Sequence, residues 1–305
     1  MSQNKRILVA LDFSKMDRVL IKYASLLTKL IPVEAMYFVN IAENLEVSDE
    51  VRTRYPDLKV PVDEVIKKEM EELIIKSDFN LKEVNSQILV REGTKADELI
   101  KLGKQKNINL TIVGRKNTLR GTGHAARQLT LKSQFSVLFV PEDCRLSISK
   151  IQVAVDFSKH SEMAVKEAVY LADKAKAEVF CQNVFIVPKG FYKTGKSYEE
   201  FSEIMRGHAE KDMEKMLKPY SNSGVKIHKI FTLDDDKRPS DKITELANEE
   251  NIDLIILGSK GRSGAASVLL GSVAERLLTF QPNSAIMILK GEGENMSFLE
   301  AFFKI

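Results

Sequence analysis

The chain has 305 residues, of which 44% are apolar and 29% charged, and its formal net charge is +3. This length predicts two domains, and the composition is typical of a soluble globular protein. Without a long basic run, an apolar stretch of about 18 residues or a leader pattern, no nucleic-acid binding, membrane span or signal peptide is expected. Two distant cysteines, Cys144 and Cys181, favour a reducing, cytoplasmic location.

Strands and helices are predicted to alternate along the chain in two similar sets. In the first half we expect strands over 6–11, 34–40, 86–90, 111–113 and 136–140, and helices over 17–30, 61–77, 95–105 and 127–133. In the second half we expect a first strand ending at Asp156, strands over 178–184, 225–231, 252–257 and 284–289, and helices over 162–176, 198–217, 240–249 and from 273. This alternation predicts parallel strands joined by right-handed crossovers.

The two halves of the chain repeat each other at a constant offset of 144 residues. Residues 8–15 (Leu-Val-Ala-Leu-Asp-Phe-Ser-Lys) recur as residues 152–159 (Gln-Val-Ala-Val-Asp-Phe-Ser-Lys), and Gly114 corresponds to Gly258. This period is far longer than the 20–50 residues typical of a solenoid, so it indicates a duplicated domain. We predict one domain over 1–147, a second over 148–292 and a tail over 293–305.

A glycine pattern follows the apolar run 252–257. Gly258 and Gly261 have two residues between them, and nine more separate Gly261 from Gly271-Ser272, which opens a helical pattern. Glycine lets the backbone turn and approach a ligand, and a helix N-terminus offers unpaired N–H groups and partial positive charge. The pattern therefore predicts a phosphate-binding loop. The alternative is that these glycines only make a strand-to-helix turn.

Residues 258–275 resemble the ATP-binding signature of the universal stress protein family, and residues 153–158 resemble its first strand. The resemblance implies tandem, doubly wound α/β domains with a five-stranded parallel sheet each, Rossmann-like and similar to adenine nucleotide alpha-hydrolases. It also implies ATP, with or without Mg²⁺, in the second domain. The residues that it assigns to the nucleotide are Asp156, Val184, Gly258, Gly261, Arg262, Gly271, Ser272 and Val273.

The first copy lacks this glycine pattern. Asn117 stands where the second copy has Gly261, and Arg127-Gln128 stand in place of Gly271-Ser272. Side chains at these positions would block the approach of a phosphate, so we expect no ATP in the first domain. Its loop is basic, which leaves open a bound anion or an acidic partner beside the simpler reading of a solvated loop.

Other polar residues support no further site. Asp156 is expected either to contact the nucleotide or to cap the following helix. Asp234, Asp235 and Asp236 are expected to form a solvated loop rather than a metal site. Ser158 and Ser272 have no evident base partner, so no catalytic residue and no metal ligand is predicted.

Two functions fit these observations. The favoured one is a nucleotide-dependent stress-response regulator, in which bound ATP sets a conformation that an unknown protein partner recognises. The alternative is a slow ATPase or phosphotransferase of the same fold. The short linker over 141–149 predicts an intramolecular pseudo-dimer, and a homodimer stays open. The apolar face of the tail is expected to cover the protein's own surface or to dock a partner.

Overall fold

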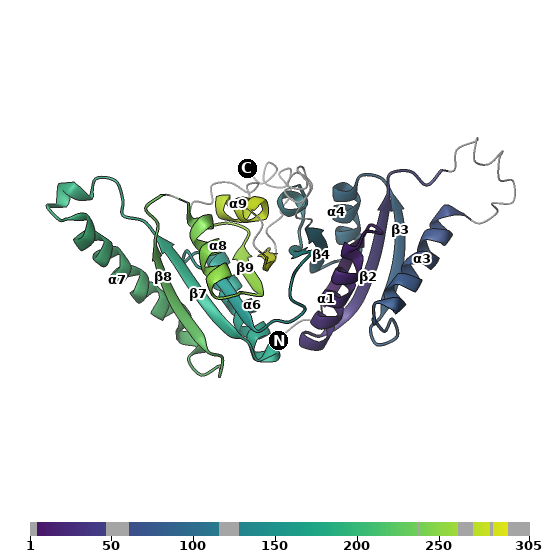
Figure 1. The fold of residues 1–305 in the computed structure, drawn as a ribbon, viewed down its shortest axis with the longest axis horizontal. Coiled ribbons are helices and arrows are strands. Elements are labelled where there is room, and N and C mark those ends of the chain that lie inside the picture. Colours follow the sequence, from purple (N-terminus) through teal and green to yellow (C-terminus); the bar gives the residue numbers. More distant parts are fainter. Residues whose placement is uncertain are drawn as a thin grey trace, which may run out of the picture. The chain divides into compact units, whose positions relative to one another are not determined.

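The computed structural model describes residues 5–46, 61–115, 128–236, 238–261, 271–280 and 283–291. The chain divides into two compact units, Met1–Glu142 and Asp143–Ile305, in which strands and helices alternate (Figure 1). The predicted boundaries at 147 and 292 stay predictions, and the predicted tail lies outside the described residues. Among the helices in the described ranges, none is long and apolar enough to span a membrane.

Unit 1 is built on a five-stranded parallel sheet, as expected. Its strands are β1 (Lys5–Leu11), β2 (Val33–Ala42), β3 (Ser86–Glu92), β4 (Leu110–Arg115) and β5 (Ser136–Pro141), and its helices include α1 (Met16–Leu30), α3 (Val62–Lys76) and α4 (Lys95–Gln105). Residues 128–132 are also helical. The strand order is β3-β2-β1-β4-β5, with parallel pairing throughout the unit.

Unit 2 repeats this arrangement. Its strands are β6 (Lys150–Ala154), β7 (Glu178–Phe185), β8 (Ile227–Leu233), β9 (Leu254–Gly258) and β10 (Ala285–Leu289). Its helices are α6 (Lys159–Ala175), α7 (Tyr198–Leu217), α8 (Pro239–Glu249) and α9 (Ser272–Phe280), with short 3₁₀ helices η1 (Phe191–Thr194) and η2 (Lys218–Tyr220). The strand order is β10-β9-β6-β7-β8, and all pairs are parallel. The chain adds β7 and β8 on one side of β6 and then β9 and β10 on the other side. Open α/β sheets bind ligands at such a switch point.

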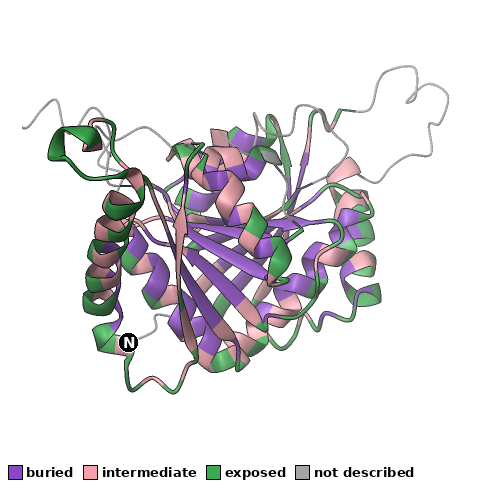
Figure 2. Cartoon of the chain, turned by 60° about the vertical axis from the view of Figure 1, so that its left-hand side comes forward, coloured by how far each residue is buried: buried purple, intermediate pink, exposed green. Residues whose placement is uncertain are grey.

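The core of each unit lies between its sheet and the helices that cover it. Figure 2 shows mostly buried strands and helices that are buried along one side, as amphipathic helices require. The strands β6 and β9 are among the most buried, with Val153 and Ile256 fully covered. Burial also raises the pKa of the Cys181 thiol on β7 to about 12, so this cysteine stays protonated.

Strand ends differ from the sequence prediction where a neighbouring strand decides them. We expected β8 over 225–231, but it runs from Ile227 to Leu233 because it pairs with β7 through to Phe185. The first strand of unit 2 ends at Ala154, two residues before Asp156. The helix η1 was not predicted.

Candidate functional site

The carboxyl ends of β6 and β9 bring two of the predicted site residues together. The strands are parallel neighbours, so the turns that follow them lie at the same edge of the sheet. One carboxylate oxygen of Asp156, Oδ2, lies 2.7 Å from the position that a Cβ atom on Gly261 would take. The aspartate and the second glycine of the loop, 105 positions apart in the sequence, are therefore in contact distance.

The turn after β6 directs this carboxylate. Asp156 Oδ1 accepts a hydrogen bond from the Ser158 N–H at 3.1 Å. The N-cap of α6 is Ser158, whose Oγ accepts from the Ser161 N–H at 3.3 Å, so helix capping is not the role of Asp156. Phe157 between them has a φ of 61°, in the left-handed region that side chains rarely adopt. One aspartate oxygen shapes the turn, and the other faces the glycine loop.

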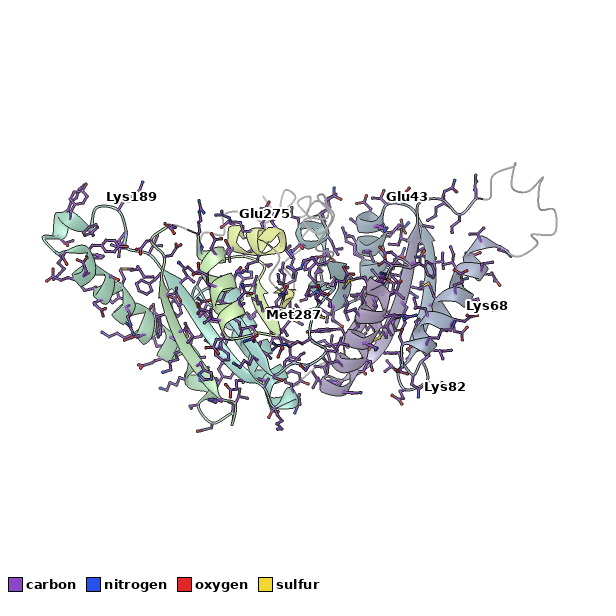
Figure 3. The ribbon with its side chains drawn as sticks, in the orientation of Figure 1. Glu43, Lys68, Lys82, Lys189, Glu275 and Met287 are labelled. Atoms are coloured by element: carbon purple, nitrogen blue, oxygen red, sulfur yellow. The ribbon has the colours of Figure 1, made fainter. Side chains whose placement is uncertain are left out.

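Gly271 stands at the entrance to α9, the helix that carries the labelled Glu275 in Figure 3. Its N–H donates to the Ser259 carbonyl at 3.0 Å, and its own carbonyl accepts from the Glu275 N–H at 3.0 Å. Gly271 thus occupies the N-cap position, and the exposed Ser272 is the first helical residue. A Cβ at 271 would lie 3.7 Å from the Ser259 carbonyl oxygen, an ordinary contact, so packing against the described residues does not demand glycine here.

Gly258 has a different reason to be glycine. A Cβ at this position would lie 2.5 Å from Cβ of His160 and 2.9 Å from its backbone carbonyl carbon. Gly258 is not among the glycines with positive φ. Close approach of the first turn of α6 to β9, rather than a sharp turn, therefore accounts for this glycine.

The backbone groups of Val184, rather than its side chain, face the turn after β6. The Val155 N–H donates to the Gln182 carbonyl at 2.8 Å, so the backbone groups of Gln182 point toward β6. Successive residues of a strand direct their backbone N–H and C=O groups to opposite sides. Val184 lies two residues after Gln182, so its backbone groups point to the same side as those of Gln182. Because β6 ends at Ala154, these groups lie beyond the strand and beside the turn that holds Asp156.

The remaining predicted site residues are placed less fully. Val273 is the second residue of α9 and is half-buried. Arg262, and the first-copy loop residues Asn117 and Arg127, lie outside the described residues.

A family model for the universal stress protein family matches the chain twice, over residues 3–141 and 147–286. The chain belongs to the universal stress protein family. Universal stress protein MJ0531 of Methanocaldococcus jannaschii is 34% identical over 131 residues, which cover 42% of this chain and 75% of the relative. Universal stress protein MJ0577 of the same organism is 28% identical over 156 residues, covering 46% of this chain and 94% of the relative.

A solved universal stress protein from Archaeoglobus fulgidus shares the fold. It is 17% identical, with a TM-score of 0.62, and the alignment covers 94% of this chain and 99% of the solved one. Together with the two family matches, this likeness agrees with two tandem universal stress protein domains in one chain.

The first universal stress protein domain differs from the second at the turn after its first strand. Asp12 Oδ2 lies 3.7 Å from the Lys95 ammonium group. The buried Asp17 carboxylate accepts from the N–H groups of Asp12, at 3.1 Å, and Phe13, at 2.7 Å. At the 144-residue offset the second domain has Ser161 in place of Asp17 and Pro239 in place of Lys95. Sequence reasoning missed Asp17 and Lys95, although comparing the copies position by position would have marked both.

One expectation about the second universal stress protein domain is wrong. Asp234 is not part of a solvated loop, since it is only 2% exposed, whereas Asp235 and Asp236 are exposed. Asp234 Oδ1 accepts from the N–H groups of Asp236 and Arg238, both at 3.1 Å. This carboxylate closes the loop before α8, which is a structural task.

Proposed function

We propose that the chain binds one ATP, in unit 2, and acts as a nucleotide-dependent regulator of a stress response rather than as an enzyme. The observation that carries the proposal is the convergence of Asp156, Gly261 and Gly271 at one edge of the sheet. Asp156 Oδ2 faces Gly261, and an added Cβ on Gly271 would lie 3.9 Å from the Gly261 nitrogen. A carboxylate, a glycine loop and a helix N-terminus thus lie close together in space.

Each of these groups suits one part of a nucleotide. A carboxylate accepts hydrogen bonds from ribose hydroxyl groups, and the backbone groups of Val184 are suited to the edge of a base. The N-terminus of α9, with Gly271 and the Ser272 hydroxyl, suits phosphates because its N–H groups and partial positive charge attract anions. Mg²⁺, when bound, would neutralise charge on the phosphates.

Unit 1 lacks the same opportunity. Its aspartate is engaged by Lys95, and the Asp17 carboxylate already accepts from two backbone N–H groups of the turn. This supports a single nucleotide per chain.

A regulatory role is favoured because the described residues of the site include no evident base or nucleophile, so recognition by a partner protein would carry the output. The cytoplasmic location, the protein partner, the pseudo-dimer and the homodimer stay predictions. They do not affect the binding test.

Isothermal titration calorimetry of the full chain with ATP tests the proposal. We expect a stoichiometry of one, and no binding by Gly271→Arg, which copies Arg127 of the first domain and blocks the N-terminus of α9. Positive charge alone would favour phosphate, so a loss would show that shape outweighs charge. A stoichiometry of two, or undiminished affinity in the folded variant, would place the nucleotide elsewhere.

A further inference from the structure

Val155, which leads from β6 into the site, is held by β7 at both its N–H and its carbonyl group. The Val155 N–H donates to the Gln182 carbonyl at 2.8 Å. The Val155 carbonyl accepts from the side-chain amide Nδ2 of Asn183 at 2.7 Å, in a buried hydrogen bond. Asn183 is 6% exposed and Val155 is 4% exposed. Gln182 therefore holds the peptide group before Val155, and Asn183 holds the one between Val155 and Asp156.

The turn that follows needs such support. Phe157 adopts a left-handed conformation that is uncommon for a residue with a side chain, and such a conformation persists when its surroundings hold it. β6 has already ended at Ala154, so no further ladder bond of that strand orients the Val155 carbonyl. The Asn183 amide takes the place of that bond.

We infer that Asn183 is a positioning residue for the nucleoside: by fixing the Val155 carbonyl it holds the Asp156 carboxylate in register with the Val184 backbone. Asn183 precedes Val184 directly, so a single residue links the two groups proposed to contact ribose and base. The glycine loop and the N-terminus of α9 belong to other elements, and among the described residues the Asn183 amide bonds to Val155 rather than to them. This inference rests on the proposed ATP site of unit 2.

Unit 1 provides an internal control for this inference. Asn40 donates from Nδ2 to the Leu11 carbonyl at 3.0 Å and is 7% exposed, and Phe13 has a φ of 59°. The same hydrogen bond therefore supports the same turn in both units. Loss of either amide should cost similar stability, but only the amide of unit 2 should affect nucleotide affinity.

The experiment compares Asn183→Ala with Asn40→Ala by calorimetry, using ATP and inorganic tripolyphosphate as probes, and records thermal unfolding of each variant. We expect Asn183→Ala to weaken ATP binding by about tenfold or more. It should leave the affinity for tripolyphosphate unchanged, because that probe lacks a nucleoside. Asn40→Ala should leave both affinities unchanged while lowering the unfolding temperature to a similar extent.

Equal losses for ATP and tripolyphosphate, or an equal loss of ATP affinity in Asn40→Ala, would overturn the inference and assign Asn183 a purely structural role. Unchanged ATP affinity in Asn183→Ala would overturn it while leaving the proposed site intact. If the wild-type chain binds no ATP, the proposed function fails and the inference with it. Should Asn183→Ala not fold, Asn183→Ser is measured against Asn40→Ser by the same criteria.

Discussion

The three glycines of the loop differ in what an added methyl group would touch. At Gly258 it would meet the backbone of α6, and at Gly261 a carboxylate oxygen. At Gly271 the nearest atom of the described residues would be the Ser259 carbonyl oxygen, at 3.7 Å. One glycine thus serves packing, and another leaves room for the side chain of Asp156. For the third, no contact with the described residues demands glycine, in keeping with the phosphate site proposed for this loop.

The packing glycine should control stability. Gly258→Ala places Cβ 2.5 Å from Cβ of His160 and 2.9 Å from its backbone carbon, so α6 has to move. We expect the free energy of unfolding to fall by about 1–3 kcal/mol, the usual cost of overpacking. Urea unfolding measures this. Gly207→Ala is the control, because no atom of the described residues lies within 4 Å of the added Cβ and alanine favours a helix. A Gly258→Ala protein as stable as the wild type would contradict the packing role.

The middle glycine should control affinity instead. In Gly261→Ala the new methyl group would meet Asp156 Oδ2 at 2.7 Å, and this end of a flexible side chain can swing aside. We expect little change in unfolding but a loss of ATP affinity of about tenfold, because the carboxylate leaves its place. Calorimetry checks this, with Gly207→Ala again as the control. If ATP affinity survives the substitution, the position of the Asp156 carboxylate does not matter for binding.

At the scale of elements, β7 and β8 are joined at their amino ends by a charged cluster. Glu178, the first residue of β7, accepts from Lys226 Nζ at 2.9 Å and contacts His228 Nε2 of β8 at 2.8 Å. The His228 ring stacks on Phe180 with centroids 4.3 Å apart. These contacts lie across neighbouring strands, the arrangement in which side-chain pairs stabilise a sheet.

This cluster should make stability depend on pH. Hydrogen bonds lower the pKa of Glu178 in the folded state, with the bond from Lys226 contributing most and the bond from His228 next. A lowered folded-state pKa stabilises the fold above the unfolded-state value of about 4.3, and that contribution is lost as the pH falls through the folded-state pKa. We therefore expect Glu178→Gln to be less stable than the wild type near neutral pH, with the difference shrinking in acid.

Urea unfolding at a series of pH values measures this difference. Glu210→Gln is a matched control, because Glu210 pairs with Arg206 within one exposed helical turn, where ion pairs contribute little. A difference between Glu178→Gln and wild type that stayed constant down to acidic pH would rule out a contribution from ionised Glu178.

At the scale of the whole molecule, two units share a fold and differ in chemistry. Strand order corresponds between them, and Asn40 and Asn183 make the same buried hydrogen bond. Their first-strand aspartates differ, since Asp12 lies near Lys95 and Asp156 lies near Gly261. With the proposed ATP site in unit 2, the residues of unit 1 would no longer need to bind a nucleotide.

The same view predicts slow chemistry. We expect ATP hydrolysis by the full chain to be absent or far below the ~1–100 s⁻¹ typical of kinases, because the part of the site that the structure describes offers no evident base to activate water. Phosphate release under multiple turnover measures the rate. Release within that range that disappeared in Asp156→Ala would favour the ATPase or phosphotransferase alternative over a regulator.

The sequence by itself determined the duplication, the alternation of strands and helices, and the family. These follow from local patterns: apolar runs in buried strands, helical periodicity, and a glycine spacing repeated at a constant offset. It also predicted correctly that both units would contain parallel sheets. Each such feature depends on residues that are near one another in the chain.

Only the tertiary structure decided what each site residue touches. The approach of Asp156 to Gly261, the contact of Gly258 with α6 and the support of Val155 by Asn183 all join different elements. Strand ends such as that of β8 depend on the neighbouring strand as well. The physical reason is that sterics and hydrogen bonds act over a few ångströms, and the fold alone brings distant segments that close.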